Sequence, residues 1–407
     1  MKSIAIIGGG AAGCFCAIEL KRRFPKAKIT IYESQDKLLA KVAVTGGGRC
    51  NLTNSFEDYK DSNGKLERLE HVYPRGHRLM KRLFNVFSPE DTVKWFENHG
   101  VRLVTQEDGC IFPKSQDAME IVHTLENLIR QEGIQVKTGH KITDITSLTE
   151  DIKVITTGGK KTDKGYEFLS KLNMETQKPV PSLFTFEIKD KGLNSLSGTV
   201  VDNATLSIPS TKFRSQGILL LTDWGISGPA TLKLSSYAAR FLSDSDYHAP
   251  LTINWLSKTQ EEALIILKGI IAENKQKKLS SINIPTLTSR LWSHLITRAQ
   301  IREDIRCGEI GSKQLNRLSA TITSYTYQIT AKGRFKEEFV TCGGVSLKEI
   351  DPNTLRSKKH PDIYFAGEVL DIDAITGGFN LQAAWTTGYT AATSITYNTA
   401  VFLVQVN

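Results

Sequence analysis

The stretch "KSIAIIGGGAAGCFCAIELKRRF", residues 2–24, decides the fold of this chain. Its first part is apolar and β-branched, as in a buried strand, and its second part has apolar residues at helical spacing. Glycines at the junction have the spacing Gly8-x-Gly10-x-x-Gly13, and "KITIYES" (28–34) then alternates as a second strand. This order of strand, glycine turn, helix and strand predicts a βαβ unit that opens a Rossmann-type domain.

The glycine turn also predicts a dinucleotide site. Glycines let a backbone approach a pyrophosphate closely at a helix N-terminus, where the helix dipole and the free amides bind the negative charge. Glu33 ends the second strand 20 residues after Gly13, so its carboxylate can accept hydrogen bonds from ribose hydroxyls. An acid at this position, rather than an arginine, favours FAD or NAD over a cofactor with a 2′-phosphate.

The composition is that of a soluble globular protein. The chain has 407 residues, of which 40% are apolar and 23% are charged, enough for two or three domains. Its apolar runs fall short of the roughly 20 residues that a membrane span needs, so we expect a cytoplasmic protein with no membrane partner. Basic residues outnumber acidic ones 52 to 43, a net charge of +9. This excess favours a polyanion such as nucleic acid, with a merely basic surface as the alternative.

Cysteine and histidine spacing predicts no disulfide framework and no metal site. The cysteines are scattered without a C-x-x-C pair, and no set of His, Asp and Glu has the spacing of metal ligands. We expect free thiols, mostly buried, at Cys14, Cys16, Cys50, Cys110, Cys307 and Cys342.

The pattern of the sequence changes twice after the first domain. From about Ser182 short strands follow one another with little helix, which is typical of a small β-barrel or a meander, and the segment 257–321 has helical periodicity. That segment carries 11 basic and 6 acidic residues, a net charge of +5. We expect three domains: a Rossmann-like one from residues 1–181 and 341–407, a β-barrel-like one from 182–256 and 322–340, and a helical one from 257–321.

The C-terminal part of the chain returns to α/β pattern and favours FAD. "IYFAGEVLD" (363–371) places Glu368 just after a strand and a glycine, and "TGGFNLQAAWTTG" (376–388) begins a helix with Gly377 and Gly378. In two-part flavoproteins such a unit closes onto the first βαβ unit, so that both chain ends hold the flavin. The alternative for the two glycines is a plain turn before a helix.

Five separated motifs give the chain a specific resemblance. They are "TGGGRCNLTN" (45–54), "DGCIFPKSQDA" (108–118), "LTDWGISGPATLKLS" (221–235), "TCGGVSLKEID" (341–351) and "IYFAGEVLDIDAITGGFNLQAAWTTGY" (363–389). Together, and in this order, they resemble the BaiN/RdsA family of FAD-dependent oxidoreductases (YhiN-like flavoproteins) across essentially the whole chain. The resemblance implies an α/β fold: a Rossmann-type FAD-binding domain formed by both chain ends, an inserted β-barrel-like domain and a small helical domain. One departure is that "KKTDKGYEF" (160–168) follows "VITTGG" at once, where many relatives have a longer segment at this side of the flavin pocket.

The motifs and the resemblance together imply a set of residues at the FAD. These are Gly8, Gly10, Ala11, Ala12, Gly13, Glu33, Ser34, Lys41, Gly47, Gly48, Arg49, Cys50, Asn51, Thr157, Gly158, Gly367, Glu368, Gly377, Gly378, Phe379, Asn380 and Leu381.

The loop "VAVTGGGRCNLTN" (42–54) supplies the catalytic candidates. Its glycines allow close backbone approach to the FAD, while Arg49 and Asn51 reach polar edges of the cofactor or bind the acceptor carbonyl. Cys50 is the candidate proton donor, and its alternative is a thiol packed under the loop. Because no second G-x-G-x-x-G is present, we expect NAD(P)H to dock only transiently.

The resemblance implies one reaction with two kinds of substrate. The reaction is hydride transfer to a C=C bond conjugated to a carbonyl, either in a uridine of 23S ribosomal RNA, which gives dihydrouridine, or in a small-molecule enone of bile-acid or steroid type. The basic segments 68–84, 257–321 and 331–339 favour ribosomal RNA or its precursor. A flavin-bearing RNA-binding protein without turnover is a further alternative.

Overall fold

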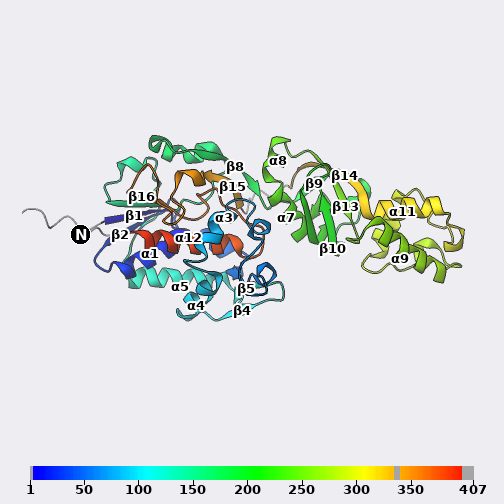
Figure 1. Cartoon of the computed structure of the whole chain (residues 1–407), viewed down its shortest axis with the longest axis horizontal. Helices are drawn as coiled ribbons and strands as arrows, with labels where there is room; N and C mark the ends of the chain where they lie inside the picture. The colour runs from blue at the N-terminus through cyan, green and yellow to red at the C-terminus, as the bar shows by residue number, and fades with distance from the viewer. Residues whose placement is uncertain (1–2, 334–339, 397–407) are drawn as a thin grey trace, which may run out of the picture. The chain divides into compact units, whose positions relative to one another are not determined.

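The computed structural model describes residues 3–333 and 340–396, which form two compact units (Figure 1). The Rossmann unit comprises residues 1–180 and 340–407, and the barrel unit comprises residues 181–339. Residues 334–339 of the basic segment 331–339 lie outside the described residues. Each unit is therefore built on its own hydrophobic core.

A parallel five-stranded sheet forms the centre of the Rossmann unit, with the strand order β16-β7-β1-β2-β6. Its strands are β1 (Ser3–Ile7), β2 (Lys28–Tyr32), β6 (Gln135–Lys137), β7 (Ile152–Ile155) and β16 (Ile363–Phe365). Ile6 on the central strand lies between Ile31 and Val154 and is fully buried, as expected for a strand covered on both faces. The sheet thus joins the first and last described parts of the chain.

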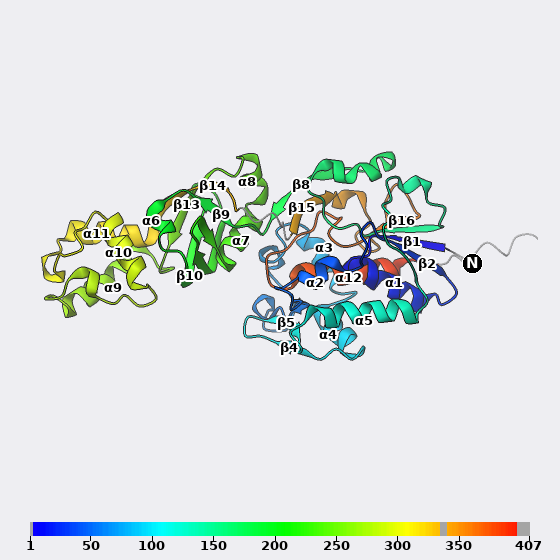
Figure 2. The same ribbon diagram turned by 180° about the vertical axis from the view of Figure 1, so that it is seen from behind.

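Helices from both chain ends pack together beside this sheet (Figures 1 and 2). The helices of the unit are α1 (Ala11–Arg23), α2 (Ala40–Val44), α3 (His77–Leu83), α4 (Pro89–Glu97), α5 (Ala118–Gln131) and α12 (Phe379–Ser394). α1 and α12 approach closely, because a Cβ on Gly388 would lie 2.7 Å from Ala12 O. Phe15 fills the interface with ring centroids 4.5 Å from Trp95 and 5.5 Å from Trp385.

Smaller elements complete the Rossmann unit. A three-stranded sheet has the order β3-β5-β4, and β8 pairs with β15. Their bounds are β3 (Thr53–Asn54), β4 (Leu103–Thr105), β5 (Cys110–Pro113), β8 (Thr176–Ser182) and β15 (Val340–Val345). The 3-10 helices are η1 (Glu57–Tyr59), η2 (Leu69–His71), η3 (Ile145–Ser147), η4 (Asp163–Leu172) and η7 (Leu347–Glu349).

The barrel unit contains a closed barrel of six strands in the order β10-β11-β12-β9-β14-β13. The strands are β9 (Phe186–Ile188), β10 (Val200–Ser207), β11 (Arg214–Leu221), β12 (Gly225–Ser227), β13 (Ala249–Asn254) and β14 (Tyr325–Lys332). Helical elements are α6 (Lys191–Asn194), α7 (Pro229–Tyr237), α8 (Ala239–Asp244), α9 (Gln260–Glu273), η5 (Leu279–Ser281), α10 (Ser289–Arg298), η6 (Cys307–Glu309) and α11 (Ser312–Ser324). One core runs from barrel residues such as Leu251 to helical residues such as Trp292.

The predicted fold class is confirmed: a Rossmann-type domain with a parallel sheet is accompanied by a closed barrel and by helices. The division into three domains stays a prediction. All six cysteines are buried, as expected. Over residues 3–333 and 340–396, no helix is both long and apolar enough to cross a membrane.

Candidate cofactor site

The glycine turn between β1 and α1 is tightly packed on one side and open on the other. Gly8 has φ +112°, and a Cβ there would overlap Thr156 O, while a Cβ on Gly13 would overlap Gly8 O. Gly10, in contrast, has no atom within 4 Å of its Cβ position. Gly8 and Gly13 therefore bring strand and helix together, and Gly10 leaves the start of α1 accessible.

The N-terminus of α1 fits an anionic ligand. First-turn N–H groups have no acceptor within their helix, and Gly10 at the N-cap has no side chain to accept from them. The first turn contains no acidic residue, whereas three basic residues follow in the last turn. The dipole at this end is therefore left for a diphosphate such as that of FAD.

Glu33 is held at the mouth of this turn. Its Oε2 accepts from Gly9 N at 2.7 Å, and its Oε1 accepts from Gln35 N at 2.8 Å and from Ser34 Oγ at 3.1 Å. Oε2 accepts only one of these bonds and has a second lone pair, so it can accept a ribose hydroxyl without breaking any of them. Glu33 and Ser34 thus lie together beside the first glycine turn.

The second glycine turn, before α12, contacts the loop that carries the catalytic candidates. Gly378 has φ +85°, and a Cβ there would overlap Thr53 O. The Asn51 amide accepts from Gly378 N at 3.2 Å and donates to Thr53 O at 3.0 Å. Asn380 pins the preceding loop, because its Oδ1 accepts from Ala374 N and its Nδ2 donates to Ala374 O. α12 also begins without a side-chain cap or an acidic first turn.

The remaining predicted residues of this turn serve packing. Gly377 has φ +129°. Phe379 is buried, with its ring centroid 4.9 Å from that of Phe56, and its carbonyl accepts from Tyr73 Oη at 2.9 Å. Leu381 packs against the core of the Rossmann unit.

The loop after α2 presents backbone rather than side chains. Gly46, Gly47 and Gly48 all have positive φ, from +61° to +83°, and Gly47 and Gly48 have no atom within 4 Å of a Cβ position. Arg49 is exposed, with its guanidinium 4.6 Å from the Phe112 ring centroid and its Nε donating to Gly46 O at 3.3 Å. The loop therefore offers an open glycine surface beside one fixed cation.

Cys50 points into the protein instead. It is fully buried in the core of the Rossmann unit, and burial raises the pKa of its thiol to about 12. This placement favours the packed thiol over the proton donor, because a group so buried exchanges protons slowly with a substrate outside the core.

Glu368 connects three segments that are distant in sequence. Its Oε2 lies 2.9 Å from Lys41 Nζ, and its Oε1 accepts from Thr341 N at 2.8 Å. A Cβ on Gly158 would lie 3.7 Å from the same carboxylate, and a Cβ on Gly367 would lie 2.8 Å from Ala12 Cβ. The loop after β7, the C-terminal unit and α1 therefore meet here.

The structure thus gathers the predicted cofactor residues around two glycine-led helix starts within the Rossmann unit. Sequence reasoning missed Lys160 and Tyr166, because it treated their segment only as a departure from related proteins. Both residues lie next to Thr157 and Glu368. No motif marks these two residues, so only their tertiary neighbours could identify them.

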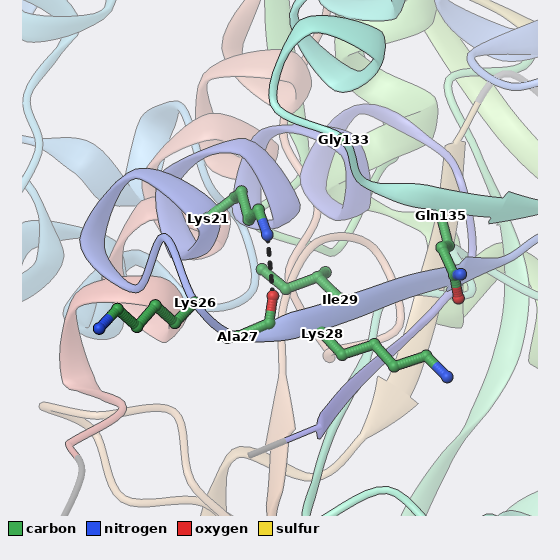
Figure 3. Close-up of a pocket in the computed structure, with 7 residues that line it drawn as sticks. All are labelled: Lys21, Lys26, Ala27, Lys28, Ile29, Gly133 and Gln135. Atoms are coloured by element: carbon green, nitrogen blue, oxygen red, sulfur yellow. Dashed lines mark hydrogen bonds between the residues drawn. The ribbon is translucent and has the colours of Figure 1, made fainter. Parts of the chain in front are cut away.

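A separate cavity of about 310 Å³ lies at the opposite end of β2 from Glu33 (Figure 3). Its lining consists of Lys21, Lys26, Ala27, Lys28, Ile29, Gly133 and Gln135. Lys21 Nζ donates to Ala27 O at 2.9 Å. This basic hollow does not belong to the cofactor site.

Comparison with known proteins gives the family. The model of the HI0933-like protein Rossmann domain matches residues 2–394. The chain is 25% identical to the 3-dehydro-bile acid delta(4,6)-reductase of Clostridium scindens, over 96% of this chain and 98% of that protein. It is 26% identical to the ribosomal RNA dihydrouridine synthases of Haemophilus influenzae (96% and 97% covered) and Escherichia coli (95% and 96% covered). The chain therefore belongs to the HI0933-like Rossmann family, and it is an FAD-dependent oxidoreductase, as its motifs predicted.

Proposed function

We propose that this enzyme reduces a uridine of 23S ribosomal RNA, or of its precursor, to dihydrouridine, with NAD(P)H docking transiently as the reductant. Two relatives that match nearly the whole chain are ribosomal RNA dihydrouridine synthases. The observation that carries the choice of substrate is the net charge of +9, because RNA binding requires contacts to phosphates. Such a substrate implies that the enzyme acts in the cytoplasm.

The exposed cations gather at one end of the helical part of the barrel unit. The backbones of Lys278 and Arg306 form an isolated antiparallel β-bridge, and Leu279 N donates to Ile305 O at 2.9 Å. This pairing brings together the exposed side chains of Lys275, Lys277, Lys278, Arg302 and Arg306. Among the described residues, Arg302 forms an ion pair with Asp304 at 3.4 Å, and the other four of these cations form none. We assign this basic bridge to RNA phosphates.

The segment 68–84 contributes charge but no stacking platform. Tyr73 and Phe84 are buried, so they cannot stack on RNA bases, and Arg75 pairs with the buried Asp373. Arg78, Lys81 and Arg82 of this segment are exposed. These three cations lie on the surface of the Rossmann unit.

When bound and reduced by NAD(P)H, FAD would supply hydride to the β-carbon of a C=C bond that is conjugated to a carbonyl, and the α-carbon would take up a proton. Negative charge then develops on the carbonyl oxygen, which a fixed cation stabilises. We assign this role to Arg49, whose Nε and Nη1 are engaged by Gly46 O and Gln116 Oε1 while its Nη2 has no acceptor among the described residues. Asn51 holds the loop against Gly378, so that Arg49 keeps its position.

A small-molecule enone is the second candidate, because the bile-acid reductase relative also matches nearly the whole chain. It undergoes the same hydride transfer and needs an apolar cleft rather than phosphate contacts. A flavin-bearing RNA-binding protein without turnover is the third outcome of the test below.

The deciding test combines a gene deletion with a reoxidation assay. The deletion strain should lack one dihydrouridine in 23S ribosomal RNA, and a plasmid copy should restore it. In vitro, anaerobically reduced enzyme should be reoxidised by unmodified ribosomal RNA and not by a 3-oxo-4,6-diene steroid. An unchanged dihydrouridine map with steroid-driven reoxidation would establish the enone reductase, and reoxidation by neither would favour the protein without turnover.

A further inference from the structure

We propose that Lys160, with the hydroxyls of Thr157 and Tyr166, binds the diphosphate of FAD. This inference rests on the FAD assignment and is independent of the RNA substrate. It gives a role to the segment 160–168, in which this chain departs from the related pattern.

Lys160 is immobilised before any ligand binds. Its Nζ donates to Thr157 O at 3.1 Å and lies 5.7 Å from the centroid of the Phe168 ring. Gly165 packs on its stem, because a Cβ on Gly165 would lie 2.5 Å from Lys160 Cβ. A lysine fixed in this way loses little side-chain entropy when it binds an anion.

The loop that carries Lys160 lies between the first glycine turn and Glu368, because a Cβ on Gly8 would lie 2.9 Å from Thr157 Cα and a Cβ on Gly159 would lie 2.9 Å from Glu368 Oε1. Burial and the nearby Lys41 lower the pKa of Lys160, whereas Glu33 and Glu368 act in the opposite direction. Glu33 marks the ribose end of the site and Glu368 marks the C-terminal unit, and Lys160 is within electrostatic range of both. Between a ribose and a flavin lies the diphosphate, whose negative charge would offset both the burial of Lys160 and its repulsion by Lys41.

Two buried hydroxyls beside Lys160 have no acceptor for their protons in the part of the chain that the structure describes, although the Lys160 backbone N–H donates toward the second of them. These are Thr157 Oγ1 and Tyr166 Oη, and the Tyr166 side chain is only 4% exposed. Burial, followed by the charge of Glu368, raises the pKa of Tyr166, so its hydroxyl keeps its proton and remains a donor. Buried donors without acceptors are costly, and phosphate oxygens would satisfy both.

The alternative is that Lys160 only braces the loop through Thr157 O. A bracing role predicts lower stability of the apoprotein and a similar loss for every ligand. Diphosphate binding predicts a loss only for ligands that contain the diphosphate.

The experiment titrates apoprotein with FAD, ADP and adenosine. Lys160→Met should weaken FAD and ADP binding roughly 10- to 100-fold, the range for hydrogen bonds to charged groups, and leave adenosine binding unchanged. Lys161→Met, at the exposed neighbouring lysine, is the matched control and should bind all three like the parent. Lys160→Arg should recover most of the ADP affinity.

Tyr166→Phe gives a second, independent readout. Adenosine affinity should equal that of the parent, while FAD affinity falls about tenfold because a donor to the diphosphate is lost. Parent-like ADP affinity in both Lys160→Met and Tyr166→Phe would overturn the proposal. So would an equal loss of adenosine binding, which indicates bracing. Failure of the RNA substrate with these binding results intact would overturn the proposed function alone.

Discussion

Helices of the two units begin in different ways. In the barrel unit, α9 starts with a capping box, in which Thr259 Oγ1 accepts from Glu262 N at 3.2 Å and Glu262 Oε2 accepts from Thr259 N at 2.7 Å. α10 starts with Thr288, whose side chain accepts from Leu291 N. In the Rossmann unit, α1 and α12 start at glycines, with no side-chain cap and no acid in the first turn. Where the protein does not neutralise a helix N-terminus, a bound anion can do so.

The difference follows the site rather than the unit. α4 and α5 also belong to the Rossmann unit, and both are capped, by Ser88 and by Asp117. α7 of the barrel unit begins at Gly228 without a cap, yet a Cβ there would lie 2.8 Å from Ile218 O, and Pro229 at the first position has no N–H to offer. At Gly10, in contrast, the Cβ position is open and the first helix amides have N–H groups to offer, so this helix start can bind an anion.

The largest effect is expected from Gly13→Val, which tests the packed side of the first turn. A side chain there overlaps Gly8 O, so the free energy of unfolding should fall by about 3 kcal/mol, the upper end for overpacking, and FAD should be lost with it. Urea unfolding of the apoprotein measures the free energy of unfolding, and the absorbance of the purified protein measures its FAD content. A variant as stable as the parent would show that strand and helix can move apart here.

Gly10→Val should separate binding from folding. Its Cβ position is open, so apoprotein stability should stay within about 0.5 kcal/mol of the parent while FAD affinity falls at least about tenfold. Flavin fluorescence quenching on titration gives the affinity. Unchanged affinity would mean that the open start of α1 does not face the cofactor.

Glu368→Ala tests the second chain end. The carboxylate accepts from Thr341 N and pairs with Lys41, so its loss should weaken FAD retention about tenfold. The same titration measures the affinity, and Glu349→Ala, at another acid of the C-terminal part, serves as the control. If the variant retained FAD like the parent, Glu368 and its C-terminal segment would not be part of the cofactor site.

Thr259→Ala tests a helix that the protein caps by itself. Loss of the cap of α9 should lower the free energy of unfolding by about 1 kcal/mol and leave FAD affinity unchanged. Thermal unfolding measures the stability, and flavin titration measures the FAD affinity. A change in FAD affinity here would contradict the assignment of the site to the Rossmann unit alone.

Cys50→Ala should have the smallest effect. Because Cys50 is buried under the loop, the rate of flavin reoxidation by substrate should equal that of the parent, whereas Arg49→Ala should slow it. Anaerobic stopped-flow mixing measures both rates. A slow Cys50→Ala enzyme with intact FAD binding would return Cys50 to the role of proton donor.

The sequence predicts best what is encoded locally. The first turn is one continuous stretch in which strand pattern, glycine spacing, helix pattern and Glu33 agree, so the Rossmann unit follows from it. The closed barrel follows from its many short strands. The contact between Lys41 and Glu368 joins residues 327 positions apart, and no local pattern encodes it. No local pattern encodes the inward direction of Cys50 either, which depends on its left-handed φ of +59°. Nor does one encode the surroundings of Lys160, because the charges that act on it come from four separate segments.

The pairing of β16 with β7 and of α12 with α1 also sets an order of events during synthesis. The first βαβ unit leaves the ribosome without the helix that covers it, and translation of the 368 residues from Ala11 to Phe379 takes on the order of 20 to 70 s at typical rates. All of the barrel unit is made in that interval. A chain that stops early lacks half of its cofactor site and exposes the apolar face of α1 to proteases and chaperones. With the cofactor site assigned to both chain ends, a molecule can bind the flavin only after its C-terminal residues have been made.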